Sequence, residues 1–161
     1  HGPVEGSWLY LSTGGRTVNA SKSFLANLWK DYAKADQRWG WADPTCVSIE
    51  ILTVLGAGPI AAYCAYLLTK NDPRYHFWAI VLSTGEIYGG FMTFSPEWLT
   101  GNKFLIGSSD FLLFYVYLCF MNLVWVFVPL YLLYDSYQAV TTGAKAAYVV
   151  KASLASVRKK R

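Results

Sequence analysis

Charge is scarce in this sequence. Only 15% of its 161 residues are charged, whereas soluble domains carry about 25%. Hydrophobic residues make up 54% of the chain and aromatic residues 17%. A chain with so little charge and so many apolar side chains is typical neither of a soluble globule nor of a disordered protein. The composition indicates a membrane protein.

Cysteine is also scarce, with three residues at Cys46, Cys64 and Cys119. An odd number without metal-type spacing excludes a disulfide-stapled secreted module, and we expect three small core side chains. The sequence also lacks a nucleotide-binding glycine loop, a metal-ligand cluster and a nucleophile elbow. It therefore predicts neither a cofactor nor a metal ion.

Basic residues gather at the end of the chain. Six of the 14 Lys and Arg lie in the last 17 residues, which finish with RKKR. A basic end that follows an apolar segment is more typical of a membrane anchor than of a nucleic-acid site. The positive-inside rule places this tail, residues 138–161, in the cytosol, and we expect no nucleic-acid partner.

Three long apolar segments organise the chain, at residues 46–68, 75–94 and 111–134. About 20 helical residues cross a hydrocarbon core about 30 Å thick, so each segment is long enough to span it. Residues 1–11 are too short to span and predict the end of a truncated helix. The chain begins with His1, and we expect a fragment that lacks its N-terminal part. The expected fold is an all-α membrane helix bundle with about three full spans and a partial one.

The stretch between the truncated helix and the first span is more polar. Residues 12–21 are rich in Gly, Ser and Thr and predict a loop. Residues 24–32 carry apolar side chains at helical spacing, with Lys and Asp between them. This pattern predicts a short amphipathic helix at the membrane interface, capped by Ser21 or Ser23.

A few polar side chains interrupt the three apolar segments, and such residues commonly mark function because they are costly in lipid. Glu50 lies in the first segment, Glu86 in the second and Asn122 in the third. Each also has a structural interpretation. Asn122 could join helices, Glu50 could reach water near the segment start, and Glu86 could pair with a Lys or Arg or stay protonated.

Two pairs at helical spacing complete the candidate set. His1 and Glu5 are four residues apart, and Asn122 and Trp125 are three apart, so each pair shares a helix face. His1 alone could be a trivial chain terminus. Taken together, these residue types predict an acid/base pocket lined by aromatic rings. Such a pocket suits the movement of a carbon–carbon double bond, because acid/base groups divide the proton transfers and a tryptophan face stabilises the carbocation.

The chain resembles the emopamil-binding protein family of EXPERA-domain membrane proteins in five ordered segments: HGPVEG, LWKDYAKADQRW, CVSIEILTVLGAGP, GEIYGG and FMNLVWVFVPLYLLYD. The resemblance covers most of residues 1–137. It implies a five-helix bundle of the endoplasmic reticulum membrane, here truncated at its N terminus. It also implies a cofactor-free isomerase that moves a sterol double bond from Δ8 to Δ7. The expected ligand is a sterol or related polycyclic lipid, and the resemblance allows a homodimer.

The resemblance assigns roles to individual residues. It places five residues in the catalytic set: His1, Glu5, Glu50, Asn122 and Trp125. The histidine and the two glutamates would serve the proton transfers, and the tryptophan would face the developing cation. A further four residues match a loop that we interpret as structural, through ion pairs near the pocket mouth: Tyr32, Lys34, Asp36 and Arg38.

One segment departs from the family pattern. The sterol isomerases usually carry G-Q-x-Y-G-D where this chain has GEIYGG, so Glu86 replaces a Gln and Gly90 replaces an Asp. We expect Glu86 and Tyr88 to line the substrate pocket. The identity of the substrate is therefore open between a sterol and another polycyclic terpenoid. A non-catalytic sterol-binding or trafficking protein, and a structural membrane subunit without a ligand, are the other interpretations.

Overall fold

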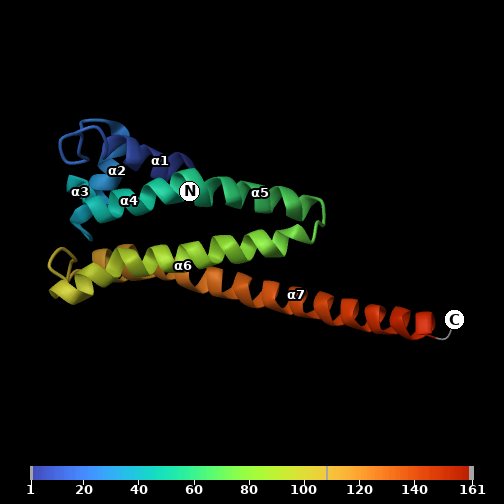
Figure 1. The fold of residues 1–161 in the computed structure, drawn as a ribbon. Coiled ribbons are helices and arrows are strands. Elements are labelled where there is room, and N and C mark those ends of the chain that lie inside the picture. Colours follow the sequence, from blue (N-terminus) through green and yellow to red (C-terminus); the bar gives the residue numbers. More distant parts are fainter. Residues whose placement is uncertain (1, 108, 160–161) are drawn as a thin grey trace.

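The computed structural model describes residues 2–107 and 109–159, and helices account for most of them (Figure 1). Seven α-helices follow one another in these ranges: α1 (Gly2–Leu11), α2 (Phe24–Tyr32), α3 (Arg38–Trp41), α4 (Pro44–Leu52), α5 (Gly58–Thr69), α6 (Arg74–Thr100) and α7 (Met121–Lys159). Two π-helical segments interrupt this pattern: η1 (Thr53–Ala57) and η2 (Leu112–Phe120). Extended pairing in the described residues is one isolated bridge, between Asp36 and Leu105. The expectation of an all-α chain is confirmed for these residues.

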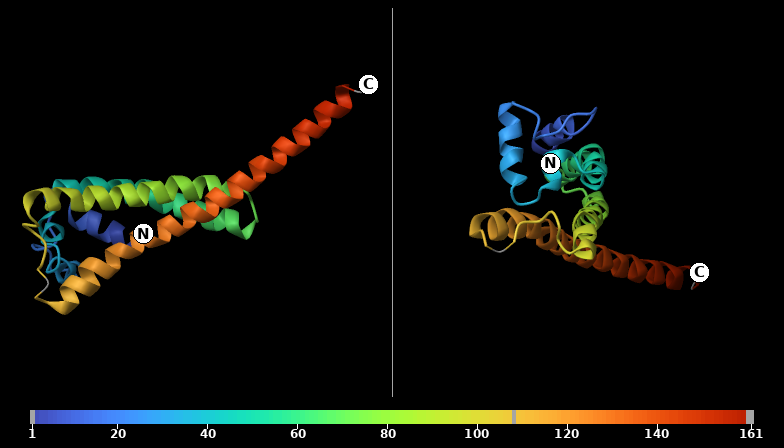
Figure 2. Two further views of the ribbon diagram at one scale, coloured as in Figure 1. Left: turned by 90° about the horizontal axis from the view of Figure 1, so that it is seen from below. Right: turned by 90° about the vertical axis from the view of Figure 1, so that its left-hand side faces the viewer.

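The long helices run side by side. Helices α4 and α5 join through η1 into one rod, which turns at residues 70–73 and returns as α6 (Figure 1). Helix α7 packs most extensively against α6 and crosses it obliquely (Figure 2). Each of the three expected helical segments is present. Each also continues past the C-terminal end expected from its apolar run, to Thr69, Thr100 and Lys159.

Two continuous helices in the described residues, Pro44–Thr69 and Leu112–Lys159, are long and apolar enough to cross a membrane. Helix α6 has 27 residues and packs against both of them, but its hydropathy is lower. Its polar residues include Glu86 and Glu97, and Pro96 lies within its last turns. Length and hydropathy therefore support two of the three expected spans.

The short helices α1, α2 and α3 meet around a cluster of indole rings. Trp29 stacks on Trp39 with 5.5 Å between ring centroids and 5° between ring planes. The indole N–H of Trp8 donates to the backbone carbonyl of Trp39 at 2.9 Å. Helix α2 begins as expected, because the Ser23 hydroxyl accepts a hydrogen bond from the Ala26 N–H at 3.2 Å. This cluster fixes α1 and α2 beside the start of α4.

The end of α7 projects away from the other helices. Ser136 is buried against α6, where its hydroxyl lies 3.3 Å from His76 Nδ1. Beyond residue 141 the described side chains are exposed, and the helix continues to Lys159 (Figure 2). The basic tail that we expected from residue 138 is thus the exposed continuation of α7. Between residues 121 and 159, no break in the helix separates it from the bundle.

Candidate functional site

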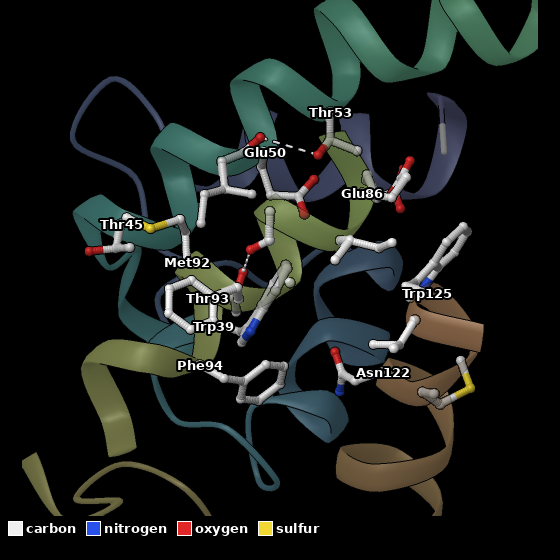
Figure 3. A pocket seen from close by; sticks show the side chains of 18 of the residues that line it. Trp39, Thr45, Glu50, Thr53, Glu86, Met92, Thr93, Phe94, Asn122 and Trp125 are labelled. Atoms are coloured by element: carbon white, nitrogen blue, oxygen red, sulfur yellow. Dashed lines mark hydrogen bonds between the residues drawn. The ribbon is translucent and has the colours of Figure 1, made fainter. Parts of the chain in front are cut away.

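A large cavity of about 1720 Å³ lies among α1, α2, α4, η1, α6, η2 and the start of α7 (Figure 3). Its wall is mainly apolar, with Trp39, Phe94, Leu105 and Met121 among the lining residues. Ligand pockets usually measure about 300–1,000 Å³. The cavity is therefore large enough for a ligand with several fused rings.

Each candidate site residue within the described range lines this cavity: Glu5, Glu50, Glu86, Tyr88, Asn122 and Trp125. They come from four helices, α1, α4, α6 and α7. The structure thus brings together residues that are up to 120 positions apart in the chain. His1 lies outside the described residues. The catalytic roles of the set stay a prediction.

Glu50 belongs to α4, shortly before the π-helical segment η1. The Asp43 side chain starts this helix by accepting hydrogen bonds from the N–H groups of Thr45 at 2.9 Å and Cys46 at 3.2 Å. Only 7% of Glu50 is exposed. Figure 3 shows its carboxylate directed into the cavity. This burial does not fit the interpretation in which Glu50 reaches water at the membrane interface.

Asn122 links α7 to α2 across the cavity wall. Its Nδ2 donates to the carbonyl oxygen of Leu118 at 2.7 Å and to the hydroxyl of Tyr32 at 3.1 Å. Leu118 belongs to η2, so this contact lies where π winding gives way to the α winding of α7. The Asn122 side chain thus contacts both its own helical rod and the Tyr32 hydroxyl of α2. Asn122 therefore joins two helices, as its structural interpretation expected.

Tyr32 is a cavity residue that we did not include in the expected site. Its ring packs edge-on against Trp39, with 5.3 Å between centroids, and its hydroxyl reaches Asn122. Burial raises the pKa of Tyr32 to about 12, although the hydrogen bond from Asn122 opposes this shift. The hydroxyl is therefore protonated at neutral pH.

Trp125 follows Asn122 by one turn of α7 and lines the same cavity. Trp125 of α7 and Glu86 of α6 both border the pocket drawn in Figure 3. Forty per cent of Trp125 is exposed in the described chain. A ligand inside the cavity can therefore contact the Trp125 ring.

A buried ion cluster holds one end of the cavity together. Arg38 donates to both carboxylate oxygens of Asp36, at 2.9 and 2.6 Å, and to the backbone carbonyl of Thr93 at 2.6 Å. Its guanidinium is also 3.7 Å from the carboxylate of Glu97, which accepts the Phe104 N–H at 2.9 Å. The cluster therefore ties α3 to α6 and to the loop that follows α6.

Three residues of this region, Thr93, Leu105 and Ile106, line the cavity. The structural interpretation of Asp36 and Arg38 is thus confirmed, and Lys34 forms a separate exposed pair with Asp31. Glu97 is a member that the sequence analysis missed. It stands four residues after Thr93 near the end of α6, where a lone glutamate gives no signal of its buried partner.

Comparison with known proteins gives a family match. The profile of the EXPERA family, the expanded EBP superfamily, matches residues 24–136. This range includes Glu50, Glu86, Asn122 and Trp125. It excludes Glu5 and the exposed end of α7.

Individual relatives agree with this match. The chain is 31% identical over 137 residues to the 3-beta-hydroxysteroid-Delta(8),Delta(7)-isomerase of Cavia porcellus, covering 84% of this chain and 58% of that protein. It is 30% identical over 144 residues to the protein of the same name from Mus musculus, covering 89% and 60%. It is 27% identical over 121 residues to the protoglabretal synthase of Citrus sinensis, covering 75% and 56%. The chain thus spans less than two thirds of the length of these relatives.

Proposed function

The chain belongs to the EXPERA family, and from this premise we propose that it carries the catalytic cavity of a sterol double-bond isomerase. The proposed reaction moves the bond from C8=C9 to C7=C8. A proton adds to C9, the positive charge develops at C8, and a proton leaves C7. The substrate gains one proton and loses one, so an acid and a base within the protein complete the cycle.

The proposed proton carriers are Glu50 and Glu5, together with His1. General acid/base groups must lie within hydrogen-bond reach of the carbon-bound proton that they move. The burial of Glu50 at the cavity wall supports this role, because a carboxyl group there exchanges its proton with a bound ligand rather than with bulk water. Its position on α4, opposite α6 and α7, lets it approach one face of a flat ring system.

Trp125 has the proposed role of stabilising the cation. An indole face attracts positive charge through its quadrupole, by about 2 kcal/mol or more where water is excluded. A carbocation has no hydrogen-bonding group, so an aromatic face is one of the few ways in which a protein can stabilise it. The apolar remainder of the wall would keep water from trapping the cation as an alcohol.

The single observation that carries this proposal is the convergence of Glu5, Glu50, Asn122 and Trp125 on one apolar cavity. The test is to express the full-length protein in yeast that lacks its own sterol isomerase and to profile the sterols. Restored Δ7 sterols would support the proposal. Continued accumulation of Δ8 sterols, with stable expression of the protein, would contradict it and favour a sterol-binding protein.

A second candidate substrate is another polycyclic terpenoid. Gly85 and Gly90 of α6 line the cavity. A methyl group added at either position would meet no atom within 4 Å. This open wall leaves room for rings with more substituents than a slim sterol carries. Feeding the expressed protein a Δ8 sterol and a methyl-substituted triterpenoid side by side distinguishes the two candidates.

Membrane placement completes the proposal. We place the bundle in the endoplasmic reticulum membrane with the end of α7 in the cytosol. The apolar helices Pro44–Thr69 and Leu112–Lys159 support membrane insertion. The six basic residues at the chain end support the orientation.

A further inference from the structure

The hydrogen bonds of Asn122 fix the orientation of its amide. Nδ2 donates to the Leu118 carbonyl at 2.7 Å, and an amide oxygen in that position would repel the carbonyl. The second hydrogen on Nδ2 serves the Tyr32 hydroxyl. Both donors of the amide are therefore in use. In the described part of the chain, no donor reaches Oδ1, which is left as an acceptor at the cavity wall.

The same contact orients the Tyr32 hydroxyl. Because its oxygen accepts from Asn122, its own hydrogen has to point elsewhere. Among residues 2–107 and 109–159, no acceptor takes this hydrogen, and Tyr32 lines the cavity. The raised pKa of Tyr32 keeps this hydrogen in place at neutral pH. A donor from Tyr32 and an acceptor from Asn122 thus stand next to each other.

We propose that Tyr32 and Asn122 form a subsite for an alcohol group of the ligand. The Tyr32 hydroxyl donates to the ligand oxygen, and the ligand O–H donates to Oδ1 of Asn122. A hydroxyl is both donor and acceptor, so it satisfies both partners. A ketone or an ether satisfies only Tyr32. The inference deepens the proposed function and rests on it for the identity of the ligand as a polycyclic alcohol.

The subsite lies where it can orient the ring system. Asn122 and Trp125 are three residues apart on α7, a rise of about 4.5 Å along the helix. An alcohol held at Asn122 therefore places the adjoining rings beside Trp125. Glu50 approaches from α4 on the other side of the cavity (Figure 3). The subsite would select one of the two end-to-end orientations of an elongated ligand.

The experiment measures binding with three saturated steroids, which have no double bond to move. They are cholestanol, cholestanone and cholestane, which differ in one oxygen group. With neutral hydrogen bonds of ordinary strength, the full-length protein should bind cholestanol about ten- to thirtyfold more tightly than cholestane. Cholestanone should fall between them. Titration in detergent or nanodiscs gives the three dissociation constants.

Two variants test the separate contributions of Asn122 and Tyr32 to the subsite. Asn122→Leu removes the acceptor, so cholestanol should lose its advantage over cholestanone. The double variant Tyr32→Phe with Asn122→Leu removes both groups, and all three steroids should bind with equal affinity. If the double variant does not fold, the single variant decides. The matched control is Tyr117→Phe, because Tyr117 lines the cavity 6.4 Å from the Tyr32 ring and should not affect the preference.

The outcomes separate this inference from the proposed function. Equal affinities in the unaltered protein, or an effect of Tyr117→Phe as large as that of the double variant, would overturn the subsite. A separate turnover assay on a Δ8 sterol tests the isomerase. Isomerisation without a preference for the alcohol would overturn the subsite alone. The expected preference without turnover would leave the subsite standing and remove the isomerase.

Discussion

At the scale of single residues, the cavity wall includes one carboxylic acid that is almost fully buried. Glu50 is 7% exposed and lies on α4 across the cavity from α7. An acid in an apolar site can hold or release a proton with less competition from solvent. Its function can be separated from its packing, because Gln has nearly the same shape and cannot exchange a carboxyl proton.

We expect Glu50→Gln to reduce turnover by about 10²–10⁴-fold, the range that general acid/base groups contribute. Sterol binding should change much less, because the cavity is largely apolar. Paired measurements of turnover and of sterol binding test this expectation. Asp31→Asn is the control, since Asp31 forms an exposed pair with Lys34 outside the cavity. Equal losses of binding and turnover would make Glu50 a structural residue.

Substitutions of Trp125 test cation stabilisation. Trp125→Phe should reduce turnover less than Trp125→Ala, because a phenyl face still attracts a cation and a methyl group does not. Turnover numbers at saturating substrate provide the comparison. If the Phe and Ala variants lose equal activity while both are folded, the aromatic face has no role in the reaction.

The sequence revealed some site residues and concealed others for a physical reason. Glu50 and Asn122 stand out because each interrupts a long apolar run. Tyr32 gives no such contrast, since it is one of several aromatic residues in a short amphipathic helix. Its contact with Asn122 spans 90 residues. Only the folded chain, in which the Tyr32 hydroxyl of α2 meets Asn122 at the start of α7, makes it a cavity residue.

At the scale of helices, apolar runs located the three long elements but not their ends. Helix α6 continues past the expected end at residue 94 because Pro96 is tolerated and Glu97 is buried against Arg38. It ends at Gly101, whose backbone has φ of +81°. This left-handed conformation costs a residue with a Cβ about 1–2 kcal/mol, so glycine is the natural residue there.

Two glycines of the same helix should therefore respond oppositely to alanine. Gly101→Ala should lower the free energy of unfolding by about 1–2 kcal/mol, through the strain of a positive φ. Gly90→Ala should raise it by about 0.5–1 kcal/mol, because Gly90 is inside the helix and an added Cβ meets no atom within 4 Å. Unfolding in detergent, without ligand, measures both. A gain from Gly101→Ala would contradict the assigned helix end.

At the scale of the whole molecule, the last helical rod is longer than a membrane is thick. Residues 112–159 form 48 continuous helical residues, about 70 Å of helix at the usual rise. A hydrocarbon core measures about 30 Å. The excess projects beyond the turn between α5 and α6, so both lie at the same end of the bundle (Figure 1).

This geometry gives a test of orientation. In sealed endoplasmic reticulum vesicles, added trypsin should cut both at the turn, beside Lys70 and Arg74, and in the tail at Lys145 and Lys151. Loss of a C-terminal epitope and the fragment sizes report the two cuts. Protection of both sites until detergent is added would reverse the proposed orientation. Cleavage of one site only would contradict the shared end of the bundle.

The π-helical segment η1 has a consequence for chain length. A π turn holds one more residue than the α turn that it replaces, so the helix takes up an insertion without rotating the residues after it. Deleting one residue from Thr53–Ala57 would restore α winding there. Glu50 before the segment and Cys64 after it would still face the same sides of the rod. Homologous chains that differ by one residue at this point can therefore share one cavity, and an alignment that places the gap elsewhere would misassign its wall.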